Sequence, residues 1–312
     1  MRDERLDPEV AKYLEHVRSM PPAHLLSISE LRRDIDKLRD FYPPEPVEKI
    51  EDIKAPGPAG EIPVRAYIPK GKGPLIPIVY FHGGGWCIGS ITSHDGVCAA
   101  IANRTPAVVF SVDYRLAPEH VFPSAVDDCY AATKYIAQNL GRFNVKTEQL
   151  VVMGDSAGGG LAAAVSLKSA AEGSPRIASQ VLIYPATDFT RADSESYRLF
   201  GKGYDLDKEM IEMFKNYYIP DSKKWADPYA SPALAKNLKD LPPTFIIAAE
   251  FDPLRDDAKA FADKLKAAGV PVKTSLHKSV IHGFLSFTTF HAAQVAFDEI
   301  RGYLEHKGHI AS

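Results

Sequence analysis

The sequence contains few cysteines, no long hydrophobic run and no large excess of charge. Its three cysteines, Cys87, Cys98 and Cys129, form no C-x-x-C pair, so we expect them to be small buried hydrophobic side chains. No run of 18 apolar residues occurs, which argues against a membrane-spanning helix. The net charge is −3 and no basic patch with interleaved aromatics is present, so we expect neither nucleic acid nor a membrane as a partner.

The composition favours one large soluble domain. The chain has 312 residues, of which 45% are hydrophobic and 25% charged, so it can bury a sizeable core. The first five residues are mostly charged and lead into no apolar segment. We therefore expect no signal peptide and a cytoplasmic location.

Strand and helix patterns alternate along most of the chain. From residue 76 onward this alternation predicts a mostly parallel sheet with helices on both faces. Two earlier stretches flank Pro56-Gly57-Pro58-Ala59-Gly60 and predict a β-hairpin with a long loop. Strands are expected at 47–53, 62–68, 76–81, 107–112, 150–153, 177–184, 244–249 and 270–276, and helices within 8–42 and at 124–140, 161–171 and 289–306.

A helical segment interrupts this alternation after residue 187. The segment from Lys208 to Tyr218 has a strongly apolar face. Such a face suits either a surface helix that covers the hydrophobic core or a lid that pairs with the N-terminal helices. The lid is favoured, because ligands bind at the carboxyl ends of strands in open α/β sheets. We therefore divide the chain into N-terminal cap helices (1–45), a first part of the core (46–187), a cap insertion (188–222) and a second part of the core (223–312).

Gly154-Asp155-Ser156-Ala157-Gly158 joins an apolar strand to a helical pattern. Glycines at this spacing predict a sharp strand-to-helix turn that exposes the hydroxyl of Ser156, because side chains at the two glycines would collide with neighbouring elements. The alternative is a glycine-rich turn that binds nothing. The rest of the chain distinguishes the two, because a nucleophilic serine needs a base, an acid and donors for an oxyanion.

A second glycine-rich segment, His82-Gly83-Gly84-Gly85-Trp86, follows the strand expected at 76–81. Consecutive glycines let the backbone approach a ligand closely and direct its N–H groups at an anion. The alternative is a flexible loop. Its position after a central strand favours a site that binds a developing negative charge.

The expected base is His282, in the loop between the last strand and the last helix. His277 competes with it, but His277 is at the end of that strand. The expected acid is Asp252, which follows the strand 244–249 and would accept the Nδ1 proton of His282. Asp256 and Asp257 are instead expected to cap and charge the start of the next helix.

Together these motifs resemble the hormone-sensitive-lipase family of esterases, and they are most similar to those of its bacterial and archaeal carboxylesterases. The resemblance implies an α/β-hydrolase fold with a helical cap, and oxyanion donors from the N–H groups of Gly84, Gly85 and Ala157, with Gly83 a lesser contributor. One departure is Lys278-Ser279, where the family often has an acidic residue and a glycine. The resemblance extends from about residue 45 to the end and rests on HGGGW at 82–86, DYRLAPEH at 113–120, GDSAGG at 154–159, DPL at 252–254 and HGF at 282–284.

These observations predict a serine carboxylesterase that hydrolyses short- to medium-chain esters through Ser156, Asp252 and His282. No metal or organic cofactor is expected, and family members are often homodimers. Amide or arylacetamide hydrolysis is the enzymatic alternative, because the same triad can perform it. A ligand-binding receptor is the other alternative, although receptors of this kind have lost the histidine. The predicted substrate pocket contains Trp86, Met210, Met213 and Phe214.

Overall fold

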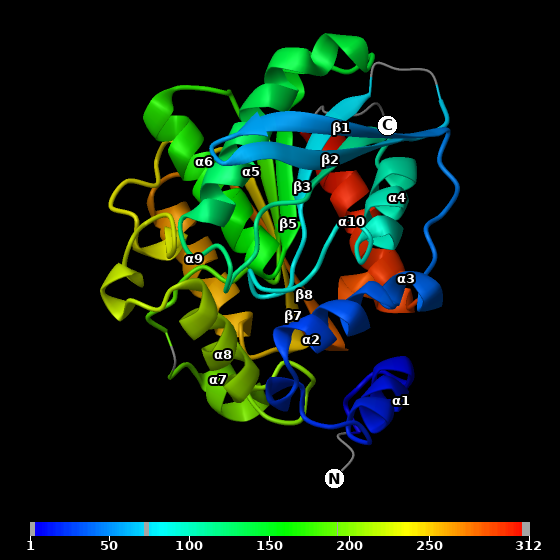
Figure 1. Cartoon of the computed structure of the whole chain (residues 1–312), viewed down its shortest axis with the longest axis vertical. Helices are drawn as coiled ribbons and strands as arrows, with labels where there is room; N and C mark the ends of the chain where they lie inside the picture. Colours follow the sequence, from blue (N-terminus) through cyan, green and yellow to red (C-terminus); the bar gives the residue numbers. More distant parts are fainter. Residues whose placement is uncertain (1–3, 72–74, 192, 308–312) are drawn as a thin grey trace.

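The structure, a computed structural model, describes residues 4–71, 75–191 and 193–307. Its centre is an eight-stranded sheet in the order β1-β2-β4-β3-β5-β6-β7-β8 (Figure 1). Strand β2 is antiparallel to β1 and β4, and the other neighbours are parallel. The predicted α/β architecture is therefore confirmed. The strands are β1 Lys49–Gly57, β2 Gly60–Ile68, β3 Ile76–Phe81, β4 Ala107–Val112, β5 Val151–Asp155, β6 Ser179–Ile183, β7 Thr244–Phe251 and β8 Val272–Ile281.

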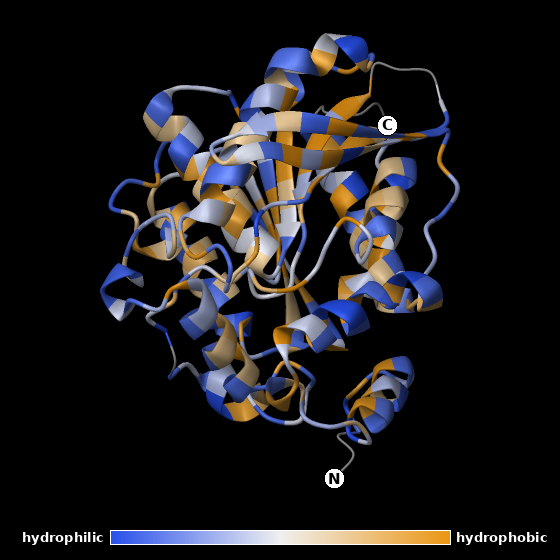
Figure 2. Cartoon of the chain, viewed as in Figure 1, coloured by the Kyte–Doolittle hydropathy of each residue, from blue (hydrophilic) through white to orange (hydrophobic). Residues whose placement is uncertain are grey.

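The central strands are buried on both faces. Every residue of β3, β4, β5 and β6 is buried, which explains their continuous apolar sequences. Figure 2 shows these strands as the most hydrophobic part of the interior, with hydrophilic residues on the outer helices. Parallel strands end at the same edge of the sheet, so the segments after β3, β5, β7 and β8 are brought together there.

The hairpin and the last strand differ from the sequence prediction. Strands β1 and β2 continue until Gly57 pairs with Gly60, so the loop is only two residues long and the predicted long loop is wrong. Strand β8 runs past its predicted end at Leu276, with a register shift opposite 249–251. The shift lies near Ser279, whose φ of 66° is the left-handed conformation that glycine adopts easily.

Helices cover both faces of the sheet. One of them, α4, was not predicted, because its small residues are almost all buried and give no amphipathic pattern. Helix α6 begins at Ala157, four residues before the predicted start, because Gly158, Gly159 and Gly160 hide the helical pattern. The helices flanking the sheet are α4 Asp95–Arg104, α5 Ser124–Asn139, α6 Ala157–Glu172, α9 Arg255–Ala267 and α10 His291–His306.

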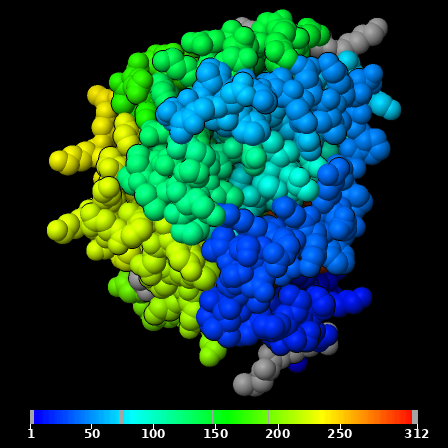
Figure 3. Space-filling model, in the orientation of Figure 1, coloured from blue at the N-terminus to red at the C-terminus, as the bar shows by residue number. Residues whose placement is uncertain are grey.

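The remaining helices lie beyond the carboxyl ends of the strands (Figure 1). The predicted helix around 31–41 is divided into α2 and α3, and the short helix η1 (Ala23–Leu25) contacts α8. Figure 3 shows the N-terminal segment in blue and the segment around 200–220 in yellow-green meeting on one face of the molecule. The four-part division of the chain stays a prediction. These helices are α1 Pro8–Val17, α2 Ile28–Asp36, α3 Leu38–Phe41, α7 Glu195–Phe200 and α8 Lys208–Tyr218.

The structure also bears on the cysteines and on the possibility of a membrane-spanning helix. Cys87, Cys98 and Cys129 are free thiols and all are buried, as expected. Across residues 4–71, 75–191 and 193–307, none of the helices combines the length and the apolar character needed to cross a bilayer.

Candidate active site

Ser156 lies on the sharp turn between β5 and α6. Its φ of 54° and ψ of −119° are a strained conformation for a residue with a side chain, and its N–H donates to the carbonyl of Ile183 at 2.8 Å. A Cβ at Gly154 would come within 2.3 Å of the carbonyl oxygen of Gly158, and one at Gly158 within 1.9 Å of that of Phe81. The two glycines are therefore required sterically, as the sequence analysis expected.

Ser156, His282 and Asp252 form a hydrogen-bonded chain. The Nε2 of His282 lies 2.8 Å from the Oγ of Ser156, and its Nδ1 lies 2.8 Å from the Oδ2 of Asp252. The other oxygen of Asp252 accepts from the N–H of Leu254 at 2.7 Å, which fixes the carboxylate on its loop. With Nδ1–H donating to Asp252, the Nε2 of His282 is available to accept the proton of Ser156.

The environment of His282 favours its protonated form. Burial alone would lower the pKa of His282, but the negative charge of Asp252 and the hydrogen bond to it outweigh burial. Asp155 and Asp205 add smaller contributions in the same direction, so the pKa of His282 is raised. An imidazolium that forms during proton transfer would be stabilised in this position.

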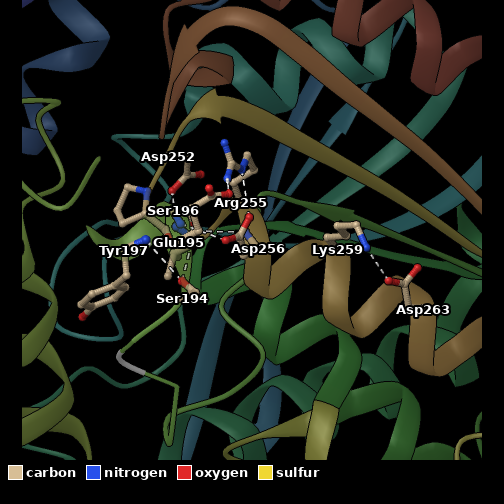
Figure 4. A network of polar contacts seen from close by, with 11 residues as sticks. Ser194, Glu195, Ser196, Tyr197, Asp252, Arg255, Asp256, Lys259 and Asp263 are labelled. Atoms are coloured by element: carbon tan, nitrogen blue, oxygen red, sulfur yellow. Dashed lines mark hydrogen bonds and ion pairs between the residues drawn. The ribbon is translucent and has the colours of Figure 1, made fainter. Parts of the chain in front are cut away.

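The competing histidine and the neighbouring acids have other partners. His277 lies within β8, and its Nε2 is 3.1 Å from an oxygen of Glu299 on α10. Asp256 accepts from the N–H of Ser196 at 2.8 Å, which ties the start of α7 to the loop that carries Asp252 (Figure 4). Asp257 accepts from the N–H of Thr187 at 2.8 Å, and burial raises its pKa to about 7. Both acids lie in the first turn of α9, as expected, but the predicted capping role is wrong, because Leu254 is at the N-cap without a side-chain hydrogen bond.

The glycine-rich loop after β3 lies beside Ser156. Gly84 and Gly85 have φ values of 114° and 57°, which only glycine adopts readily. The N–H of Gly83 donates to Asp155 at 2.9 Å, so it is unavailable to a ligand. Within the described residues, the N–H groups of Gly84, Gly85 and Ala157 have no protein acceptor, and all three residues line the cavity that Ser156 faces.

A buried polar cluster holds this loop from behind. Besides Gly83, Asp155 accepts from the hydroxyl of Tyr80 at 2.7 Å and lies 3.4 Å from the Nε2 of His94. The ring of His82 stacks on Tyr114, whose hydroxyl donates to the carbonyl of His82 at 2.8 Å. This cluster gives the GDSAGG and DYRLAPEH segments a structural role near the site.

A cavity of about 510 Å³ opens onto Ser156 and His282. Trp86, Met210 and Phe214 line it, but Met213 does not, and this geometric prediction is wrong. Met210 and Phe214 are one turn apart on the same face of α8, and Met213 packs against the hydrophobic core. Figure 1 shows α8, which carries these residues, beyond the ends of the strands.

The sequence analysis missed other residues of the cavity wall. Tyr13 of α1 and Asp205, in the segment between α7 and α8, line the cavity together with His282. Neither belongs to a motif. They are 192 positions apart in the sequence, so the sequence pattern does not predict their hydrogen bond. In the part of the chain that the structure describes, no group of three histidine, cysteine or acidic side chains is placed to hold a metal ion.

The fold and the site together define a class of protein. A serine on a strand-to-helix turn, bonded to a histidine and an aspartate from later loops, is the arrangement of serine hydrolases built on a mostly parallel sheet. The family model described as alpha/beta hydrolase fold matches residues 78–286. The chain belongs to this family, and within it to the proteins that resemble hormone-sensitive lipase.

Relatives of this chain include named esterases. Esterase LipI of Mycobacterium tuberculosis is 35% identical over 293 residues, with 90% of this chain and 88% of the relative covered. The arylesterase of Saccharolobus solfataricus is 34% identical, with 90% and 92% covered. Carboxylic ester hydrolase LipN of Mycobacterium tuberculosis is 44% identical over 76% of this chain, which spans only 64% of that relative's length.

Solved structures show the same fold over nearly the whole chain. A hyperthermophilic esterase from the archaeon Pyrobaculum calidifontis superposes with a TM-score of 0.92 at 36% identity, covering 98% of this chain and 99% of the esterase. The ester hydrolase EH1AB1 from the metagenome of Lake Arreo, solved with a bipyridine phosphonate derivative, gives a TM-score of 0.91 at 38% identity, with 97% and 99% covered.

Proposed function

We propose that this member of the family is a serine carboxylesterase that acts on short- to medium-chain esters. The observation that carries the proposal is the hydrogen-bonded chain from Ser156 through His282 to Asp252, beside backbone N–H groups without protein acceptors. The esterase names of the relatives support the same class of reaction. The complete triad favours catalysis over the receptor alternative, since a receptor has no need of a proton acceptor for the serine.

The proposed reaction begins with attack by Ser156. Its Oγ adds to the ester carbonyl while its proton passes to Nε2 of His282, and Asp252 stabilises the imidazolium. The oxyanion accepts hydrogen bonds from the N–H groups of Gly84, Gly85 and Ala157. His282 then gives the proton to the leaving alcohol, and the acyl group stays on Ser156. Water, deprotonated by His282, attacks the acyl-enzyme and releases the acid.

The geometry provides stabilisation where charge develops. Each well-placed oxyanion donor contributes about 3 kcal/mol to stabilising the transition state. The N-terminus of α6 lies next to the same position, and its partial positive charge acts in the same direction. The apolar side chains of Trp86 and Phe214 line the cavity and can bury an acyl chain, at roughly 0.8 kcal/mol per methylene removed from water.

The experiment that tests the proposal is covalent labelling of the nucleophile. An organophosphate should form one adduct, located on Ser156 by mass spectrometry, and should abolish hydrolysis of p-nitrophenyl butanoate. Ser156→Ala should lose both the adduct and the activity while its circular dichroism stays that of the wild type. An adduct at another residue, or undiminished activity in the variant, would contradict the proposal. A matched butanoyl anilide tests the amidase alternative, which would require comparable turnover of the two substrates.

A further inference from the structure

The cavity that His282 lines also has polar side chains in its lining. Asp205 and Tyr13 are among them, and the Oδ2 of Asp205 accepts from the hydroxyl of Tyr13 at 3.1 Å. The apolar part of the lining, including Trp86 and Phe214, adjoins the glycine loop. A Cβ built on Gly85 would come within 2.1 Å of the ring of Phe214, which places that ring directly over the loop.

Asp205 and His282 line the same cavity, and their charges favour each other's charged form. Burial raises the pKa of Asp205, while the hydrogen bond from Tyr13 and the charge of His282 favour its ionised form. In return, Asp205 contributes to the raised pKa of His282.

The segment that carries Asp205 is held in a defined conformation. Asp205 has a φ of 76°, an uncommon conformation for a residue with a side chain. The N–H of Gly203 donates to Asp207 at 2.7 Å, and the carbonyl of Gly203 accepts from Arg18 of α1 at 3.0 Å. Tyr13 packs on Phe287, 4.5 Å between ring centroids, in the segment just after His282. These contacts therefore fix the position of the Asp205 carboxyl group in the cavity lining.

Asp205 retains hydrogen-bonding capacity toward the cavity. The hydroxyl of Tyr13 is its one hydrogen-bond donor among the described residues, whereas a carboxylate has about four acceptor positions. The side chain is only half-buried although burial perturbs its pKa, which is the combination expected for a group that faces an internal cavity.

We propose that Asp205, positioned by Tyr13, determines specificity for the alcohol portion of the ester by binding a protonated amine there. The inference rests on the proposed function: His282 protonates the leaving oxygen, so the alcohol portion lies on the side of Ser156 that His282 occupies. A carboxylate in the cavity lining attracts a positive charge and accepts its N–H. The substrate class is therefore esters of amino alcohols, with the acyl chain on the apolar side.

The test uses two esters of the same shape. The butanoate esters of 2-(dimethylamino)ethanol and of 3-methylbutan-1-ol differ by N–H⁺ in place of C–H. At neutral pH, wild type should prefer the cationic ester by about tenfold in kcat/KM, the effect of one charge-assisted hydrogen bond. Asp205→Asn should abolish most of that preference, and Tyr13→Phe should reduce it. Protonation of His282 affects both esters equally, so the ratio does not depend on it.

A charge control distinguishes direct contact from the overall field of the cavity. Asp34 also lines the cavity, on α2, and is paired with Lys37. Asp34→Asn removes the same charge and should keep the wild-type ratio. Equal ratios in wild type and Asp205→Asn would overturn the assignment, as would an equal loss of preference in Asp34→Asn.

A second measurement needs only wild-type protein. Free 2-(dimethylamino)ethanol should inhibit hydrolysis of p-nitrophenyl butanoate about tenfold more strongly than 3-methylbutan-1-ol, because the same hydrogen bond forms. Equal or weaker inhibition would overturn the assignment even if Asp205→Asn does not fold. Failure of the proposed function looks different: neither ester would be turned over, and Ser156 would carry no organophosphate adduct.

Discussion

Two histidines near the turn that carries Ser156 differ in the direction in which their pKa is shifted. At the cavity, His282 faces Asp252, and its pKa is raised. Behind the glycine loop, burial and the neighbouring His94 lower the pKa of His82 to about 3. One imidazole is therefore prepared to gain a proton during the reaction, and the other remains neutral.

The two carboxylates of the region, Asp252 and Asp155, are also shared differently. Asp252 accepts one backbone N–H and directs its other oxygen at His282. Asp155 accepts from Tyr80 and the N–H of Gly83 on a single oxygen, which His94 also approaches. Burial would raise the pKa of Asp155, but the charge and hydrogen bond of His94 and the bond from Tyr80 lower it. The first carboxylate thus orients the proposed base, and the second holds a loop.

Removal of the imidazole at the cavity should have the largest effect. His282→Ala should lower kcat by about 10⁴-fold, because Ser156 then has no proton acceptor. His277→Ala is the matched control, since His277 is bonded to Glu299 and does not line the cavity. Steady-state hydrolysis of p-nitrophenyl butanoate measures both. A large loss in the control with little loss in His282→Ala would mean that the other histidine is the base.

Removal of the structural carboxylate should have a smaller effect on kcat and an additional effect on stability. Asp155→Asn should lower kcat by about 10- to 100-fold, because a neutral amide holds the N–H of Gly83 less strongly than a carboxylate does, so the proposed oxyanion donors are less well fixed. It should also lower the free energy of unfolding by about 3 kcal/mol, the cost of disrupting a buried charged group.

Asp95 provides the control for that prediction. Its carboxyl group is also buried and bonded to a tyrosine, Tyr67, and to Arg65, but within the described part of the chain it accepts no hydrogen bond from the glycine loop. Asp95→Asn should show a comparable loss of stability in urea unfolding with kcat near that of wild type. If both variants lose kcat equally, Asp155 has no specific role in positioning the loop.

The loss of activity on acidification should come mainly from protonation of His282, although Asp257, whose pKa is about 7, and Asp205, whose pKa is also raised, line the same cavity. The base must be neutral, so kcat/KM falls as the pH decreases through the pKa of His282. Because that pKa is raised, the midpoint should lie above about 6.5, and His82 titrates too low to contribute. Asp205→Asn should move the midpoint to lower pH, since the charge of Asp205 raises the pKa. A midpoint below that of an ordinary histidine would contradict the electrostatic account.

The sequence predicted the parts of the site that local chemistry determines. Gly154 and Gly158 are required by close backbone contacts, and the order of Ser156, Asp252 and His282 follows from the strands that precede them. These features are visible in short segments. The homodimer, the cytoplasmic location and the catalytic roles themselves stay predictions.

Features that depend on packing between distant segments could not be predicted. Tyr13 and Asp205 meet only because α1 and the segment after α7 lie on the same side of the sheet. Helix α4 is buried on nearly all sides and so lacks the periodicity by which a helix is found. Met213 was assigned to the pocket from the apolar pattern of its segment, and that pattern does not distinguish it from Met210, which lines the cavity.

The smallest expected effect concerns the apolar wall and the length of the acyl chain. Phe214→Ala and Met210→Ala should shift the optimum toward longer p-nitrophenyl esters, because the space they vacate admits further methylenes, each contributing up to about fourfold in kcat/KM. Phe214 lies against Gly85, so its removal opens space beside the proposed oxyanion donors. Met210→Ala should shift the optimum less than Phe214→Ala does. Met213→Ala is the control, from the same helix but outside the cavity wall, and should keep the wild-type profile. The measurement is kcat/KM from acetate to laurate in all four proteins. Identical profiles would show that α8 does not line the acyl site, and a shift in Met213→Ala alone would show that its effect is transmitted through core packing.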